Sequence, residues 1–233
     1  MSGLVRLGFT ALFSAFLAHA AAGQTASVAL KRGDRVVFLG DSITQAGAGP
    51  KGYVTLVRTE LAKESKGPQV EVIGAGISGN KVPDLENRLE RDVLAKKPTV
   101  VVIYIGINDV WHGEGDPAKG TLPDRFEKGI SGVVDRIRAT GARVILCTPS
   151  VIGEKKDGAN KLDARLDQYS SLTRKIAKEK KTGLCDLRQG FQDYLAKANL
   201  DNRDAGILTS DRVHLNEAGD QFVAAEMLRA LGR

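Results

Sequence analysis

The sequence predicts an α/β fold with three layers, in which a parallel sheet of five strands lies between two layers of helices. Short β-branched runs alternate with longer amphipathic segments, with no internal break. Several of the short runs are apolar at consecutive positions, which is typical of strands whose two faces are both covered. Uninterrupted alternation of this kind favours right-handed crossover connections between parallel strands.

The expected strands and helices follow from this alternation. Strands are expected at residues 35–39, 70–73, 99–105, 143–147 and 183–186, in the flavodoxin-like order 2-1-3-4-5. Helices are expected at residues 52–66, 82–96, 122–140, 162–181 and 216–231, and long polar loops at residues 110–121 and 149–161. Ligands bind at the carboxyl ends of the strands in an open parallel sheet. A functional site is therefore expected in the loops that follow the strands.

The composition is that of a globular protein. The chain has 233 residues, of which 42% are hydrophobic and 27% charged, which is enough to build a core without a disulfide framework. This balance excludes the collagen-like, coiled-coil and intrinsically disordered classes. The net charge is +6, but the basic residues are interleaved with acidic ones and form no stripe with aromatic neighbours. A nucleic-acid partner is therefore not expected.

The amino-terminal segment predicts export. Arg6 is the only charged side chain before Lys31, and residues 7–18 form an apolar stretch followed by small-x-small patterns at 18–20 and 20–22. The stretch is shorter than the roughly 20 residues that span a bilayer, so a signal peptide is favoured over a membrane anchor. Residues 1–22 are expected to be a signal peptide. Residues 23–233 are expected to be one secreted or periplasmic domain, without a membrane partner after cleavage.

Two cysteines, Cys147 and Cys185, each lie near the end of a strand-like run. Export would permit a disulfide between them, but small buried thiols also pack well at such positions. Two core thiols are favoured, and a bridge remains open. The chain has no CxxC pair, and only two histidines, His112 and His214, follow the expected signal peptide. No zinc or other metal site and no cofactor is therefore predicted.

A serine follows the first expected strand. Ser42 comes directly after Gly40 and Asp41 and opens a helical segment, which would expose its hydroxyl at the head of the sheet. Its backbone N–H would then point into the site near a helix N-terminus, where negative charge is stabilised. The alternative is a structural helix cap, for which Asp and Ser are both preferred residues.

A glycine-rich segment follows the second expected strand. Residues 74–79 read GAGISG and match the GxGxxG pattern of dinucleotide-binding proteins. That fingerprint belongs to the first βα unit and needs an acidic residue at a strand end about 20 positions later, where this chain has a predicted helix. Nucleotide binding is therefore not favoured. Glycines here still allow a backbone N–H to approach a ligand closely.

Two further segments carry polar side chains, one after the third expected strand and one before the last expected helix. Asn108, after Gly106 and before Asp109, is placed to donate its amide N–H to an oxyanion, although the same residues fit an ordinary Asx turn. Asp211 lies three residues before His214, an offset that lets the carboxylate accept from Nδ1 and leaves Nε2 free as a base. A solvent-facing pair is the alternative, and His112 is the competing base. His214 is favoured.

Together these segments supply a nucleophile, oxyanion donors and a base with a carboxylate partner at one edge of the sheet. At these residues the sequence resembles the GDSL or SGNH family of serine hydrolases. The resembling segments are 38–44 (FLGDSIT), 76–79 (GISG), 104–109 (YIGIND) and 211–216 (DRVHLN), and they span most of the chain after the signal segment. One departure is Gly74, near a position where the family often has asparagine. The GxSxG elbow of the α/β-hydrolases is absent.

The resemblance implies an SGNH hydrolase fold and an acyl-enzyme mechanism. It implies that Ser42 is the nucleophile and that His214 and Asp211 complete a triad. It also implies that an oxyanion is held by the N–H groups of Ser42 and Gly79 and by the side-chain amide of Asn108. No metal or cofactor takes part in such a mechanism.

The expected substrate is a small acyl ester, with acetyl esters of carbohydrates favoured. The chain leaves little room for a lid domain, which favours small acyl groups at an open site. Trp111, beside the Asn108 segment, is a candidate platform for a sugar ring, or it packs within its own loop. Asp41 is a second candidate substrate contact. Similar family members include lysophospholipases and thioesterases, which remain alternatives, as does a non-catalytic secreted binding protein on the same fold.

Overall fold

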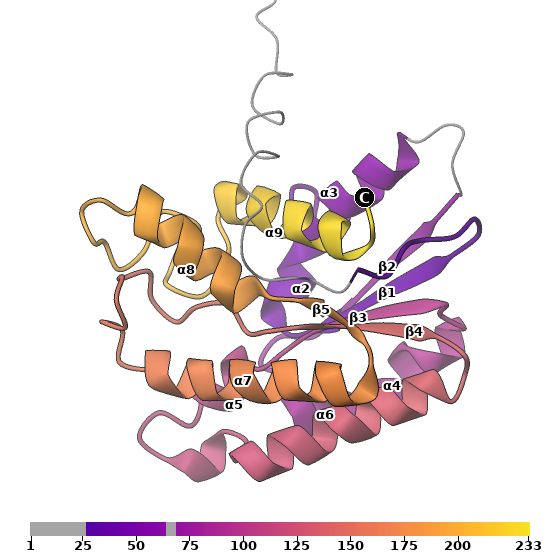
Figure 1. Cartoon of the computed structure of the whole chain (residues 1–233), viewed down its shortest axis with the longest axis horizontal. Coiled ribbons are helices and arrows are strands. Elements are labelled where there is room, and N and C mark those ends of the chain that lie inside the picture. Colours follow the sequence, from indigo (N-terminus) through magenta and orange to yellow (C-terminus); the bar gives the residue numbers. More distant parts are fainter. Residues whose placement is uncertain (1–26, 64–68) are drawn as a thin grey trace, which may run out of the picture.

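A computed structural model describes residues 27–63 and 69–233, and the expected signal segment lies outside them. Within these residues the chain forms a sheet between two layers of helices (Figure 1). The strands are β1 (Arg35–Gly40), β2 (Glu71–Gly76), β3 (Val100–Tyr104), β4 (Arg143–Cys147) and β5 (Gly183–Cys185). Their order is β2-β1-β3-β4-β5 and every pair is parallel. The predicted three-layer fold and strand order are confirmed.

Helices cover both faces of the sheet (Figure 1). One face carries α3 (Tyr53–Ala62), α8 (Leu187–Ala198) and α9 (Glu217–Ala230), and the other carries α4 (Val82–Asp92), α6 (Pro123–Arg138) and α7 (Asp163–Lys180). The short elements are α2 (Ser42–Gly47), α5 (Ile107–Trp111), η2 (Leu94–Lys96) and η3 (Pro117–Lys119). All five residues of β3 are buried, as their consecutive apolar side chains predict for a strand covered on both faces.

Helix α8 lies in a stretch where no helix is predicted. Its buried residues Leu187, Phe191 and Leu195 recur at four-residue intervals, as expected for the inner face of a helix. Gly190 interrupts this pattern in the sequence. In the structure, a Cβ at Gly190 would lie 3.2 Å from the Phe222 ring of α9. The glycine that weakens the helical signal therefore allows α8 and α9 to pack closely.

The carboxyl ends of β1, β2 and β3 lie at the same level of the sheet. Gly40, the last residue of β1, is the register partner of Gly76 in β2 and of Tyr104 in β3. β2 is longer than predicted because it continues through the glycines, so the loop after it begins at Ile77. The chain order reverses between β1 and β3, which is where open α/β sheets bind ligands.

The two cysteines are free thiols, as favoured by the sequence. Cys147 and Cys185 are register partners at the ends of β4 and β5, and both are buried. The Cys147 thiol lies 3.8 Å from the Met227 sulfur of α9. These side chains therefore contribute to the core between the sheet and α9. Across residues 27–63 and 69–233, no helix has both the length and the apolar character needed to cross a bilayer.

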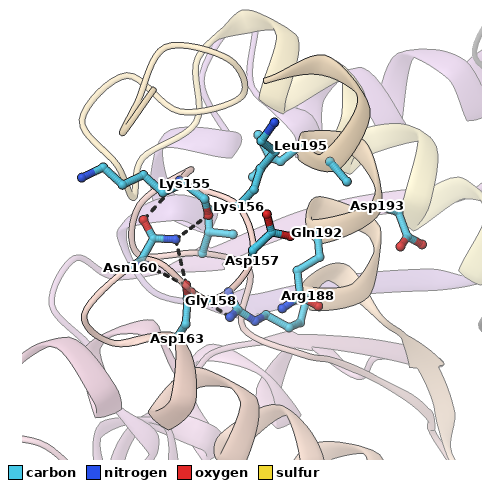
Figure 2. Close-up of a pocket in the computed structure, with 12 residues that line it drawn as sticks. Lys155, Lys156, Asp157, Gly158, Asn160, Asp163, Arg188, Gln192, Asp193 and Leu195 are labelled. Atoms are coloured by element: carbon cyan, nitrogen blue, oxygen red, sulfur yellow. Dashed lines mark hydrogen bonds and ion pairs between the residues drawn. The ribbon is translucent and has the colours of Figure 1, made fainter. Parts of the chain in front are cut away.

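A buried arginine joins α7, α8 and the loop after β4. Arg188 is 1% exposed and forms ion pairs with Asp163 at 2.8 Å and Asp167 at 2.7 Å. It also donates to the Ser150 carbonyl at 3.1 Å. Figure 2 shows Arg188 and Asp163 pointing toward one another in the wall of a cavity between this loop and α8. The cluster fixes both the loop and α8 against α7.

We predict that Arg188→Met lowers the free energy of unfolding by about 3 kcal/mol or more, because it leaves the buried Asp163 carboxylate without its cation. Arg91→Met is the matched control, since Arg91 also pairs with a carboxylate but its side chain is 74% exposed. Loss of this solvent-exposed pair should lower the free energy of unfolding far less. Urea unfolding of the two variants measures the difference. Equal destabilisation would contradict this account of the Arg188 cluster.

Candidate active site

Ser42 lies on a tight turn between β1 and α2. The preceding Asp41 is the N-cap of α2, and its carboxylate accepts a hydrogen bond from the Ile43 N–H at 3.0 Å. The Asp41 carbonyl accepts from the Gln45 N–H at 2.9 Å. The exposed-serine and helix-cap interpretations therefore both describe this turn, with Asp41 as the cap and Ser42 half-buried after it.

Ser42, His214 and Asp211 form a hydrogen-bonded chain. The Ser42 Oγ lies 2.9 Å from His214 Nε2, although the two residues are 172 positions apart in the sequence. His214 Nδ1 lies 2.7 Å from Asp211 Oδ2. The other carboxylate oxygen, Oδ1, accepts from the N–H groups of Val213 at 3.1 Å and His214 at 2.8 Å. The structure thus brings together the three residues that the sequence singles out for nucleophilic chemistry.

The electrostatics of Asp211 favour its ionised form. Burial alone would raise its pKa, but hydrogen bonds from the His214 ring and from two backbone N–H groups hold the pKa below the ordinary value of 3.8. The side chains of His214 and Asp211 are 36% and 52% exposed. The histidine is therefore oriented by a carboxylate anion at a site that is open to solvent. An ionised partner of this kind stabilises the imidazolium that forms when Nε2 takes a proton.

The two expected oxyanion donors lie on neighbouring loops. Gly79 has φ +75° in the loop after β2, a conformation that glycine adopts without strain. Asn108 lies in the first turn of α5, and its Nδ2 donates one hydrogen bond to the Asn80 carbonyl at 3.1 Å. An amide nitrogen carries two hydrogens, so one N–H of Asn108 remains for a ligand. The Ser78 N–H donates to the Gln45 side chain at 2.7 Å, which fixes this loop against α2.

The β2 end packs directly on the turn that carries the serine. A Cβ at Gly76 would lie 2.2 Å from the Gln45 nitrogen and 2.7 Å from the Asp41 carbonyl oxygen. Contacts this close exclude any side chain. Gly76 is therefore needed for α2 to lie against β2, whereas a Cβ at Gly79 would meet nothing within 4 Å.

Arg88 of α4 connects the strand ends beneath the site, and sequence reasoning missed it. Its guanidinium donates to the carbonyls of Gly40 at 2.8 Å and Ala75 at 2.9 Å, and to the Asn80 side chain at 2.6 Å. Arg88 is 7% exposed and lies on the helix face that buries Val82, Leu85 and Leu89. An arginine in the apolar stripe of a helix is the signal that would have identified it.

Asp109 connects α5 to the start of α4. It is fully buried, and its carboxylate accepts from the Val82 N–H at 3.0 Å. Burial raises the pKa of Asp109 to about 6. The pKa of Asp41 rises to about 7, chiefly through burial and further through the charge of Asp109. These two carboxyl groups therefore become neutral at a much higher pH than ordinary aspartates do.

The remaining candidate residues take no part in the hydrogen-bonded chain of Ser42, His214 and Asp211. Asp109 is three residues before His112, the same offset as in the Asp211 pair, but its carboxylate accepts from the α4 backbone instead. Trp111 ends α5 and is 36% exposed, one helical turn beyond Asn108. Asp41 is 2% exposed and occupied in capping. Among the described residues, no group of three or more His, Cys, Asp or Glu side chains is placed to hold a metal ion.

Comparison with known proteins identifies relatives over most of the chain. The GDSL-like lipase/acylhydrolase family matches residues 38–222. An acetylxylan esterase from Geobacillus stearothermophilus is 34% identical over 215 residues, which cover 86% of this chain and 94% of that protein. An isoamyl acetate-hydrolyzing esterase homologue from Rattus norvegicus is 26% identical, covering 81% of this chain and 78% of that protein.

Solved structures give the same result. The crystal structure of the acetyl xylan esterase AlAXEase superposes with a TM-score of 0.82 at 47% identity, covering 84% of this chain and 99% of that one. The Geobacillus enzyme has a TM-score of 0.78 at 31% identity. Its solved catalytic mutants replace a serine, an aspartate and a histidine. The architecture is the SGNH hydrolase fold, and the chain belongs to the GDSL-like lipase/acylhydrolase family as a carboxylic ester hydrolase.

Proposed function

We propose that this protein removes acetyl groups from carbohydrate esters, with acetylated xylan chains as the substrate class, through a Ser-His-Asp acyl-enzyme mechanism. The observation that carries the proposal is the hydrogen-bonded chain from Asp211 through His214 to Ser42 at 2.7 and 2.9 Å. Support for the substrate comes from the two acetylxylan esterases among its relatives.

In the first half of the reaction, the Ser42 hydroxyl attacks the ester carbonyl carbon while His214 Nε2 takes its proton. The tetrahedral oxyanion accepts hydrogen bonds from the N–H groups of Ser42 and Gly79 and from the free N–H of Asn108. The intermediate collapses with cleavage of the bond to the sugar oxygen, which receives the proton from His214. An acetyl ester of Ser42 and a free sugar hydroxyl result.

In the second half, water attacks the acetyl-enzyme in the same geometry. His214 takes a proton from the water, and the tetrahedral intermediate expels the Ser42 oxygen, which regains its proton. Acetate is released and the enzyme returns to its starting state. The Asp211 carboxylate stays ionised throughout and stabilises the imidazolium. In the Geobacillus relative, too, the aspartate and histidine replaced in the catalytic mutants are three positions apart, which supports these roles.

The position of Trp111 supports a sugar-binding role. It lies one helical turn after Asn108, so its exposed indole is on the side of α5 that carries the oxyanion amide. Indole faces stack well on the apolar faces of pyranose rings, whereas a free acetyl group needs no such platform. The open triad fits a substrate whose acetyl group projects from a long chain.

Export of the enzyme is part of the proposal. It is supported by the charge and apolar pattern of residues 1–22, which match a signal peptide. Polymeric xylan is found outside cells, so secretion or a periplasmic location would bring enzyme and substrate together.

We predict that Ser42→Ala abolishes release of acetate from acetylated xylooligosaccharides and that Asn108→Ala slows turnover about a hundredfold, because one oxyanion donor is lost. The matched control is Ser171→Ala, which changes an exposed serine on α7. Acetate release followed enzymatically gives the rates. A Ser42→Ala protein that deacetylates at the wild-type rate would refute the mechanism.

Faster cleavage of long-chain acyl esters or thioesters than of acetyl esters by the wild type would favour the lysophospholipase and thioesterase alternatives.

A second prediction concerns the indole. Trp111→Ala should raise the KM for acetylated xylooligosaccharides about fivefold, a loss in the range of one aromatic contact, and leave p-nitrophenyl acetate hydrolysis within about twofold of wild type. Leu122→Ala serves as the control, because Leu122 is also a large exposed apolar residue, at 56% exposure. Steady-state kinetics on both substrates give the comparison. The platform role is wrong if Trp111→Ala alters both substrates to the same degree.

A further inference from the structure

The segment that carries Asp211 and His214 has little regular secondary structure. It links α8 to α9, and its backbone pairs with itself at an isolated bridge between Thr209 and Leu215. Arg212, inside the turn, has φ +84°, a conformation that favours glycine. A strained, irregular turn keeps its geometry where surrounding groups hold it. The position of the His214 ring therefore depends on contacts from outside this segment.

A buried carboxylate from the loop after β4 supplies such contacts. Glu154 is fully buried. Its Oε1 accepts from the N–H groups of Leu208 at 2.7 Å and Thr209 at 2.6 Å, and from the Thr209 hydroxyl at 2.9 Å. Its Oε2 accepts from the Ile207 N–H at 2.8 Å. Four hydrogen bonds from three consecutive residues, 207–209, thus converge on the Glu154 side chain. The last of these donors, Thr209, lies two positions before Asp211.

The backbone beside Glu154 holds the same segment at two more points. The Gly153 N–H donates to the carbonyl of the strained Arg212 at 2.8 Å, and the Glu154 N–H donates to the Asp204 carbonyl at 2.9 Å. Asn199, at the end of α8, donates to the Glu154 carbonyl at 2.8 Å. Residues 153 and 154 therefore hold this segment at Asp204 and at residues 207–209, which precede the turn, and at Arg212, which lies inside it.

The loop that carries Glu154 is itself fixed on its other side. Asn160 accepts from the Lys155 N–H at 3.2 Å and donates to the Asp163 carboxylate at 2.9 Å, and Asp163 pairs with Arg188 (Figure 2). Arg188 also holds the Ser150 carbonyl at 3.1 Å. A continuous set of polar contacts therefore runs from the core of α7 and α8 to the histidine turn.

We propose that Glu154 is a positioning residue for ester hydrolysis, whose carboxylate holds residues 207–209 so that the His214 ring reaches Ser42. The inference rests on the proposed function, because it assigns His214 as the base. Glu154 acts through the turn and does not contact the substrate. A carboxylate suits this place because it only accepts hydrogen bonds, and each of the four contacts is a donor.

The test uses Glu154→Gln, which has the same shape but turns one acceptor oxygen into a donor. We expect kcat for p-nitrophenyl acetate to fall about tenfold or more while KM stays within about twofold, because a displaced base slows the chemistry without changing binding. Asp34→Asn is the matched control. Asp34 is 5% exposed and accepts from Thr99 at 2.7 Å and Arg143 at 2.6 Å. It precedes β1, at the amino ends of the strands, whereas the active site lies at their carboxyl ends. Its kcat should stay near the wild-type value.

A folded Glu154→Gln enzyme with wild-type kcat overturns the inference, and so does an equal loss of kcat in Asp34→Asn. Thermal unfolding by circular dichroism establishes that each variant is folded at the assay temperature.

If Glu154→Gln does not fold, Thr209→Val tests the inference instead, since it removes one of the four hydrogen bonds to Glu154. It should lower kcat about threefold, and an unchanged kcat overturns the inference. Ser42→Ala, assayed in parallel, separates the two claims, because retained hydrolysis in that variant refutes the proposed function itself.

Discussion

The proposed chemistry depends on one contact, the hydrogen bond between the Ser42 hydroxyl and His214 Nε2 at 2.9 Å. Its two partners are 172 positions apart in the sequence. Ser42 lies on the turn after β1, an internal strand of the parallel sheet, and His214 lies on an irregular segment before α9. A hydrogen bond weakens steeply once its geometry is lost. The fold must therefore hold two unrelated turns in place, and buried polar side chains such as Arg88 and Glu154 hydrogen-bond to the backbone beside those turns.

The two turns are held by different means. The sheet register and the close contact between Gly76 and α2 fix the serine side, and Arg88 ties the strand ends together from below. The turn that carries His214 is not part of the sheet, and hydrogen bonds from its preceding residues to the buried Glu154 carboxylate hold it instead. Burying a charge is costly unless every hydrogen bond is made, so each of these residues has several partners. The result is a solvent-open site held by hydrogen bonds on both sides, which agrees with the proposed removal of acetyl groups from a carbohydrate chain.

The fold and the Asp211–His214 pair were predictable from sequence because their signals are local, whereas the placement of Ser42 beside His214 was implied by the resemblance to a known family. Consecutive apolar residues mark β3, and the three-residue offset of Asp211 and His214 allows their contact without knowledge of the rest of the chain. Helix α8 was missed because Gly190 interrupts its apolar pattern, and its role becomes clear only beside Phe222. Arg88 and Glu154 were missed because the partners that place them at the site lie far away in the sequence, 48 positions for the Gly40 carbonyl and 53 to 55 positions for residues 207–209. The identity of a buried polar residue shows that it needs partners, but not which ones.

Covalent labelling with a fluorophosphonate, followed by mass spectrometry of the digested protein, tests directly whether His214 activates Ser42. An activated serine attacks the phosphorus and expels fluoride, which leaves a stable adduct on the nucleophile. We expect one adduct per chain, located on Ser42, and its loss in His214→Ala. An unlabelled Ser42 in a protein that hydrolyses acetyl esters, or labelling that persists without His214, would contradict this expectation.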